Sequence, residues 1–489
     1  ESGLLAYQWG SASASRARAA RAERELAEAQ RRLDDLQPPA GGGASGGEAG
    51  TGDLLARLGE LLGGGSGGLG ELLGGDATAC TQALADAAPG GGLGGLFGGG
   101  GQAGGGDRRA QVRSIARTVE RLRGLRFKRL PAPRFLSPAA LGRRVAASVA
   151  AYPDARADAD SRALVALGAL PAGANLKTLQ AKALGGSVAG FYDPDSGELV
   201  VGSPSGAARI GPAEQVALAH ELEHALADQN LRLPAAAERP PAGQADAALG
   251  ALAVVEGDAT LTMQQYSLAR LGLGDQLSIL SDALPAQGRL DRLPAYLGQR
   301  LTFPYLQGMT FVCRLYADGG WASVNRAYDR PPTTSAQVLF PDRYQAREAA
   351  VDPRDPTAPA PWRQAGRESF GAADLLWLLQ APGGQRGRAL DRPLERVAAW
   401  AGGELATFTD GPRTGVGLAL AERRGSGGLC QSVQAWYQAA FPESRQEAAG
   451  PGEVMVRQGR TGRAVLRCPA GEVRLGIAPD PAVAAALAA

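Results

Sequence analysis

The only two histidines of this 489-residue chain stand four positions apart, as His220 and His224. Side chains at positions i and i+4 of an α-helix lie on one face, so this pair can bind a single divalent metal ion. Two glutamates, Glu221 and Glu223, stand between them, and a glutamate beside such ligands can act as a general base. The spacing therefore indicates a zinc site with its base, rather than two unrelated histidines of an amphipathic helix.

The two glutamates leave two assignments of the base open. An H-E-x-x-H motif makes Glu221 the base, whereas the inverted H-x-x-E-H motif gives that role to Glu223. The two side chains flank the histidine row on opposite sides, so helix geometry alone does not choose between them. The choice has to come from other parts of the sequence.

The sequence around the histidines predicts a helix. Pro212 stands at an expected first helical position, residues 213–227 are good or tolerable helix formers, and Asn230 is the expected end. Asp228 continues the histidine row one turn beyond His224. It is a candidate to orient a ligand imidazole, and the alternative is a carboxylate that faces water.

Two histidines leave a tetrahedral catalytic zinc site one protein ligand short. The chain has no third histidine and no C-x-x-C pair among its four cysteines, so the remaining candidates are mainly acids. Residues 253–261 form an apolar, helix-compatible segment that contains Glu256 and Asp258. An acid in such a segment needs a partner, and a metal ion is one. Asp258 is a second candidate to orient a ligand.

These motifs resemble those of the gluzincin group of zinc metallopeptidases, especially bacterial envelope or secreted members. The resemblance rests on H-E-L-x-H-A-L-x-D-Q from His220 and on E-G-D-A from Glu256. It implies Zn²⁺ as the cofactor and a peptide or protein as the substrate. It also implies that His220, His224 and Glu256 bind the metal and that Glu221 is the general base.

Other segments extend the resemblance over roughly residues 115–380. Residues 190–201 predict two strands around an Asp-Pro-Asp-Ser-Gly turn, and peptidases of this kind bind the substrate backbone along an edge strand at that place. Further similar segments are Phe303-Pro304-Tyr305 with Gly308, Gly319-Gly320-Trp321, Pro331-Pro332 and 337–341.

The chain departs from this group at Phe340, where relatives tend to carry a histidine. A tyrosine or an arginine would then have to polarise the developing oxyanion. The tyrosine candidates are Tyr266, Tyr305 and Tyr344, and packing is the simpler role for each.

We expect an α+β fold: a mainly helical, zincin-like metallopeptidase domain with a small antiparallel sheet, followed by a small α+β module. Composition divides the chain into an exposed helix (1–40), a Gly-rich flexible linker (41–106), the peptidase-like domain (107–384) and the accessory module (385–489). In the module, alternating patterns predict strands at 404–409, 415–421, 453–458, 464–468 and 472–477, with a helix near 429–441.

The pairing of the cysteines indicates the cellular compartment, and the net charge indicates which partners to expect. Cys430 and Cys468 are candidates for a disulfide, and the alternative is two buried thiols of a cytosolic domain. Cys80 in the linker and Cys313 in a buried helix have no obvious partner. The chain starts at Glu1 and contains no transmembrane run, which fits an extracellular or cell-envelope protein whose signal peptide or anchor was removed. A net charge of +2 gives no reason to expect nucleic-acid binding.

Two functions remain open from the sequence. The first is a zinc-dependent peptidase. The second is a catalytically inactive, metal-stabilised scaffold or binding protein of the cell envelope, in which the same ligands hold a structural ion. An open coordination position would favour the enzyme, and a closed four-ligand site would favour the scaffold.

Overall fold

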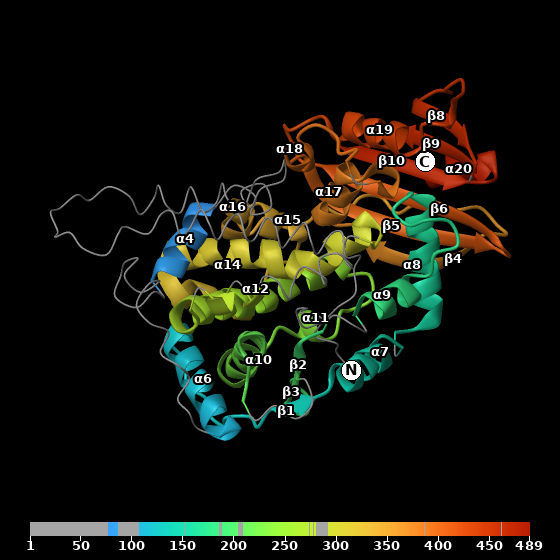
Figure 1. Cartoon of the computed structure of the whole chain (residues 1–489). Helices are drawn as coiled ribbons and strands as arrows, with labels where there is room; N and C mark the ends of the chain where they lie inside the picture. Colours follow the sequence, from blue (N-terminus) through green and yellow to red (C-terminus); the bar gives the residue numbers. More distant parts are fainter. Residues whose placement is uncertain are drawn as a thin grey trace, which may run out of the picture.

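The computed structural model describes residues 77–86, 107–150, 152–184, 188–203, 209–272, 274–276, 278–279, 292–385, 387–460 and 462–489. Helices dominate the first and larger part of these residues, and a broad sheet lies towards the C-terminal end (Figure 1). The fold is therefore mixed α+β and mostly helical. The helix expected within residues 1–40 and most of the expected linker lie outside the described residues.

The helices gather around two long ones, α12 and α14, which lie side by side (Figure 1). The bounds are α4 (Ala77–Ala85), α6 (Arg108–Arg123), α7 (Pro138–Ala150), α8 (Asp154–Ala166), α9 (Leu176–Leu184), α10 (Pro212–Leu231), α11 (Ala235–Glu238), α12 (Ala245–Arg270), α14 (Ala295–Asp329), α15 (Ser335–Leu339), α16 (Pro341–Gln345), α17 (Ala372–Gln380), α18 (Pro393–Val397), α19 (Leu429–Ala440) and α20 (Pro481–Leu487), with a 3₁₀ turn at Pro382–Gly384. Within the described ranges, every helix is too short or too polar to cross a bilayer.

Glycines allow α12 and α14 to approach closely. A Cβ atom on Gly257 would lie 2.3 Å from the backbone of Gly308, and a Cβ on Gly308 would lie 2.4 Å from the carbonyl oxygen of Ala253. Any side chain at either position would push the helices apart, because packed backbones leave no room for it. The crossing therefore presses α14 against the turn of α12 that carries Glu256.

Three strands form a small sheet beside α10. Their order is β1-β3-β2, with the bounds β1 (Arg134–Leu136), β2 (Gly190–Asp193) and β3 (Glu198–Gly202). β2 and β3 make the hairpin predicted for residues 190–201. The sequence predicted an antiparallel sheet, but β1 pairs with β3 in parallel. A parallel pair needs a long crossover between its strands, and α7, α8 and α9 lie between β1 and β3 in the chain. Within the part of the chain that the structure describes, β2 is an edge strand.

The second sheet is antiparallel and contains seven strands. In sheet order these are β4 (Arg363–Ser369), β5 (Trp400–Asp410), β6 (Arg413–Glu422), β10 (Glu472–Ala478), β9 (Gly462–Arg467), β8 (Glu453–Gly459) and β7 (Arg445–Gln446). All five strands predicted in this part of the chain are present, and α19 occupies the predicted helix position. The alternation of apolar and polar residues was sufficient to locate them.

The large sheet and the helices share one hydrophobic core. Val254 of α12, Leu379 of α17, Leu420 of β6 and Trp436 of α19 are members of the same buried cluster. The sheet also begins before residue 385, since β4 is its first strand and pairs with β5. Packing is therefore continuous across the position at which the sequence suggests a boundary.

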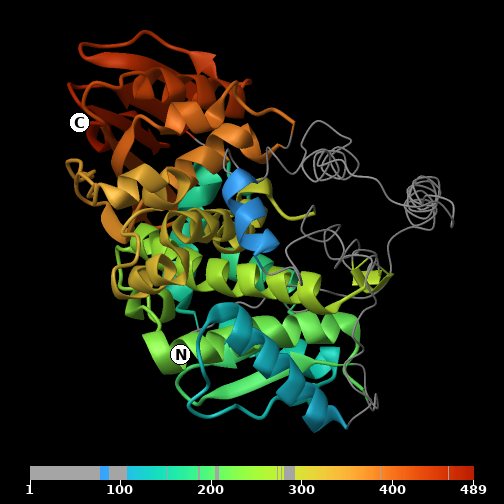
Figure 2. The same ribbon diagram turned by 90° about the vertical axis from the view of Figure 1, so that its left-hand side faces the viewer.

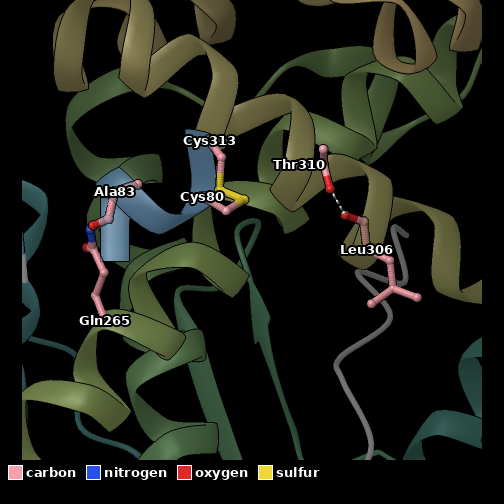
Figure 3. Close-up of a disulfide and its surroundings, with 6 residues drawn as sticks. All are labelled: Cys80, Ala83, Gln265, Leu306, Thr310 and Cys313. Carbon is pink, nitrogen blue, oxygen red and sulfur yellow. Dashed lines mark hydrogen bonds between the residues drawn. A yellow bond between two sulfur atoms is a disulfide. The ribbon is translucent and has the colours of Figure 1, made fainter. Parts of the chain in front are cut away.

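The sequence predicted a flexible linker over residues 41–106, but residues 77–85 of that range form the helix α4. Cys80 of this helix is disulfide-bonded to Cys313 of α14, although the sequence suggested a partner for neither cysteine. Gln265 of α12 donates a hydrogen bond of 2.7 Å to the carbonyl of Ala83 (Figure 3). In Figure 2, α4 lies on the surface of the helical layer. A short helix such as this is stabilised by tertiary packing, which sequence periodicity does not reveal.

The second disulfide joins the pair expected from the sequence. Cys430, at the start of α19, and Cys468, which follows β9, are bonded with their Cα atoms 6.0 Å apart. Among the described residues, no cysteine is free. The bond ties α19 to the sheet that it covers.

The two disulfides are expected to differ in their contribution to stability. In the chain-entropy model, the Cys80–Cys313 bond, which spans 233 residues, contributes about 5 kcal/mol, and the 38-residue Cys430–Cys468 loop contributes about 4 kcal/mol. We predict that Cys80→Ala/Cys313→Ala lowers the unfolding midpoint more than Cys430→Ala/Cys468→Ala, measured by denaturant titration of oxidised proteins. The reverse order would show that α4 is only weakly coupled to the core.

Candidate metal centre

The local sequence explains why α10 begins and continues where it does. Pro212 occupies the first turn, and the backbone N–H of Gly211 donates to the carboxylate of Glu214 at 2.8 Å, which caps the helix start. The middle of α10 is buried on all sides, from Val216 to Ala227. A polar group in this stretch must therefore find its partner inside the protein.

Three side chains converge at the centre of the helical layer. The Nε2 atoms of His220 and His224 lie 3.1 Å apart, and Oε2 of Glu256 lies 3.2 Å from the first and 3.5 Å from the second. Ligand atoms around a tetrahedral zinc ion, each about 2.0–2.1 Å from the metal, lie about 3.3–3.4 Å apart. The observed separations match this spacing, so the three side chains can hold one metal ion.

The charge of Glu256 fits the same function. Burial alone would raise the pKa of its carboxyl, but the imidazoles of His224 and His220 outweigh that effect and hold the pKa below its ordinary value. The carboxylate is thus anionic at neutral pH, as a metal ligand must be.

Gly257, the next residue of the E-G-D-A motif, is required by the close contact with Gly308.

Glu221 lies between the metal centre and the edge strand β2. The backbone N–H of Tyr192 lies close enough to the Glu221 carboxyl to act against the rise in its pKa, and a Cβ atom on Gly190 would lie 3.0 Å from the Cγ of Glu221. Within the described part of the chain, its Oε2 has no hydrogen-bond partner. Burial, which is the largest effect, raises the pKa of this carboxyl to about 8.

Glu223 occupies a different place. Its carboxylate lies 3.8 Å from Nδ1 of His224, the ring nitrogen that points away from the three converging ligand atoms. Burial raises the pKa of Glu223 well above its usual range, and the negative charge of the neighbouring Asp258 raises it further. Glu223 therefore stands behind a candidate ligand rather than in front of the candidate metal position.

The two acids expected to orient the ligands contact other residues. Asp228 accepts a hydrogen bond of 2.7 Å from the hydroxyl of Tyr192, whereas Nδ1 of His224 has no hydrogen-bond partner among the described residues. Asp258 accepts hydrogen bonds from the guanidinium of Arg123, the shortest of them 2.8 Å, and from the hydroxyl of Tyr328 at 2.9 Å. Neither carboxylate is hydrogen-bonded to an imidazole.

Of the three tyrosine candidates, only Tyr305 lies at the centre. Its ring stacks on His220 with 6.2 Å between centroids. Tyr266 donates its hydroxyl hydrogen to Gln215, and Tyr344 donates to the carbonyl of Arg330. Phe340, where the chain departs from the gluzincin pattern, packs under the guanidinium of Arg343.

Sequence reasoning missed Tyr192, Arg123 and Glu238. Tyr192 lies beside both Glu221 and Asp228. The pKa of Glu238 is raised mainly by burial and further by the negative charge of the nearby Asp228. Arg123 belongs to the basic stretch 121–129, in which nothing in the sequence distinguishes a buried arginine from exposed ones. Only the packing of α6 identifies it.

No protein-family model, no curated protein and no solved structure matched this chain in our comparisons. The evidence for a metal site is therefore the arrangement of its own side chains.

Replacing the acidic member of the candidate ligand set tests the site directly. Glu256→Ala is expected to lower the metal content after dialysis by orders of magnitude, because two imidazoles alone bind zinc weakly. Elemental analysis of the folded variant measures this. Glu238→Gln, a neighbouring acid outside the three converging atoms, should keep the wild-type stoichiometry. Equal zinc content in wild type and Glu256→Ala would exclude Glu256 as a ligand.

Proposed function

We propose that this protein is a zinc-dependent peptidase of the gluzincin type. The observation that carries the proposal is the convergence of His220, His224 and Glu256 at tetrahedral spacing, with the carboxylate of Glu221 next to them. Two nitrogens and one oxygen are the donor set of a catalytic zinc site that keeps its fourth position for water or substrate. A bound zinc ion would polarise a peptide carbonyl and acidify a water molecule there.

Glu221 is proposed as the general base. The charges that act on its carboxyl are those of two candidate ligands, His220 and Glu256, whereas Glu223 lies at the Nδ1 edge of His224. The backbone N–H of Tyr192 lies beside the Glu221 carboxylate, whose Oε2 has no hydrogen-bond partner among the described residues. A cation bound beside it would favour the ionised form of Glu221, which would then take a proton from the attacking water and deliver it to the leaving amine.

The substrate class follows from the strand beside the base. Among the described residues, β2 pairs only with β3, and its other edge would accept an extended peptide by β-augmentation. Gly190 and Tyr192 of this strand contact Glu221. A peptide backbone aligned on β2 would thus bring its carbonyl groups close to the base.

The compartment is proposed from the covalent structure. Cys80–Cys313 and Cys430–Cys468 are both bonded, and structural disulfides persist in oxidising environments. We place the protein outside the cytoplasm, at the cell envelope or secreted.

The alternative function is a catalytically inactive scaffold stabilised by the same ion. One observation favours it: His220, Glu221, His224 and Glu256 are each at most 2 % exposed. The two functions are separated by adding a chelator, which lowers thermal stability in both cases but stops peptide hydrolysis only in an enzyme. The native protein is incubated with a mixture of denatured proteins as substrates, and the cleavage sites are identified by mass spectrometry.

Glu221→Gln is expected to reduce kcat by about 10²–10⁴-fold, since the base is lost. The zinc content should equal that of wild type, because all three ligands remain. The measurement combines single-substrate kinetics on a peptide found in the digest with elemental analysis.

Glu223→Gln is the matched comparison for this prediction. At saturating zinc it should still hydrolyse the peptide, because Glu223 does not face the ligand atoms. An inactive, zinc-loaded Glu223→Gln beside an active Glu221→Gln would establish the inverted motif instead.

Of the three tyrosine candidates, Tyr305 is the one whose ring stacks on a candidate ligand, His220, and we propose its hydroxyl as the oxyanion donor. Tyr305→Phe is predicted to lower kcat by about 10²–10³-fold, the cost of removing one oxyanion donor. KM and zinc content should change little. Tyr344→Phe, which removes a hydroxyl bonded to a distant carbonyl, is the control. Unchanged kcat in Tyr305→Phe would reduce Tyr305 to a packing residue.

A further inference from the structure

A cluster of charged side chains is buried directly behind the candidate metal centre. The Arg123 guanidinium lies 2.8 Å from a carboxylate oxygen of Asp258 and 3.7 Å from one of Glu223. All three side chains are completely buried. None of them belongs to the proposed ligand set, so the reaction itself does not explain why the protein buries them.

The C-terminal part of α14 fixes the guanidinium in place. Arg123 lies over the ring of Trp321 at 4.3 Å, and one of its nitrogens donates to the side chain of Asn325 at 2.7 Å. The indole N–H of Trp321 donates to the carbonyl of Leu122, next to the arginine. α14 can provide these contacts because it breaks at Gly320, whose φ of 61° suits glycine. The arginine therefore has one defined position.

The two partners of Arg123 come from the two helices that carry the candidate ligands. Glu223 belongs to α10, next to His224, and lies 3.8 Å from its Nδ1. Asp258 belongs to α12, two residues after Glu256. α6, which ends at Arg123, packs on both helices. A single guanidinium thus connects the backbone segments that supply both kinds of ligand.

We propose that Arg123 is a positioning residue of the metal centre. Through its hydrogen bonds to Asp258 on α12 and its 3.7 Å contact with the carboxylate of Glu223 on α10, it holds Glu256 and His224 at metal-binding distance before the ion arrives, and it keeps Glu223 at the Nδ1 edge of His224. This inference rests on the proposed metal site and adds the group that preorganises it. Carboxylates behind a ligand imidazole fix the orientation of its ring and commonly change metal affinity 10–100-fold.

A purely stabilising function would not require these residue types. Buried ion pairs contribute little net stability, and apolar side chains of similar volume often replace them without loss. The distinction can therefore be measured: a neutral replacement should leave folding intact, but it should weaken metal binding only if the cluster positions the ligands.

The test uses the full chain in which all three charges are removed together, Arg123→Met/Glu223→Gln/Asp258→Asn, so that no buried charge is left unpaired. Zn²⁺ affinity is measured by competition with a chromophoric chelator, and the ligand geometry by the visible spectrum of the Co²⁺-loaded protein. We expect the Kd for Zn²⁺ to rise 10–100-fold and the Co²⁺ bands to shift. Asp246→Asn, a change at another buried acid of α12 that contacts Ser335 instead, should alter neither.

Each outcome decides the proposal. If the triple variant binds Zn²⁺ with wild-type affinity and an unchanged Co²⁺ spectrum, Arg123 is not a positioning residue, although the metal site stands. If the wild-type protein itself binds no Zn²⁺, the proposed function fails as well. Should the triple variant not fold, Arg123→Met/Asp258→Asn, which removes the guanidinium together with the carboxylate that it is hydrogen-bonded to, provides the same two measurements.

Discussion

Buried charge is the constraint on which the centre of this protein depends. The ionisable side chains that are almost fully buried between α6, α10 and α12 are Arg123, His220, Glu221, Glu223, His224, Glu256 and Asp258. Each would cost several kcal/mol if left without a partner. The structure divides them into two adjoining groups: three converge as a candidate metal site, and three form an ion-pair cluster behind it. Glu221 belongs to neither group and lies between the candidate metal site and the strand β2.

Close helix packing keeps these groups in contact. Gly257 and Gly308 let α14 lie directly on α12, and the break at Gly320 turns the rest of α14 towards Arg123. One long helix can therefore contribute the Tyr305 ring to the front of the centre and the Trp321 ring to the back. The Cys80–Cys313 bond attaches α4 to the segment of α14 between these two contacts. A shift of α14 would therefore change both the contact of Tyr305 with His220 and the contact of Trp321 with Arg123.

The seven-stranded sheet contributes to the same core but contains no comparable cluster of metal-binding side chains within the described residues. Its interior residues, such as Leu420 and Leu475, pack against the helical side of the molecule through α17 and α19. The chain also passes into the sheet early, since β4 precedes the boundary suggested by composition. We therefore regard the sheet as a support for the helical layer.

The sequence alone determined the features that depend on local spacing. The i, i+4 histidine pair, the helix that carries it, the hairpin at 190–201 and the strands of the C-terminal sheet all follow from periodicities of 3.6 or 2 residues. The apolar segment 253–261 offered two acids, and the resemblance to gluzincins pointed to Glu256 of the two. Long-range packing decided the rest. Periodicity could not show that Glu223 lies behind His224, that Asp228 binds Tyr192, that β1 joins β3 in parallel, or that Cys80 reaches Cys313. Arg123 is the clearest case, because in the sequence it is one of several arginines in a basic stretch. Its burial against two carboxylates exists only once α6, α10, α12 and α14 have assembled, since charge compensation depends on distances in space rather than along the chain.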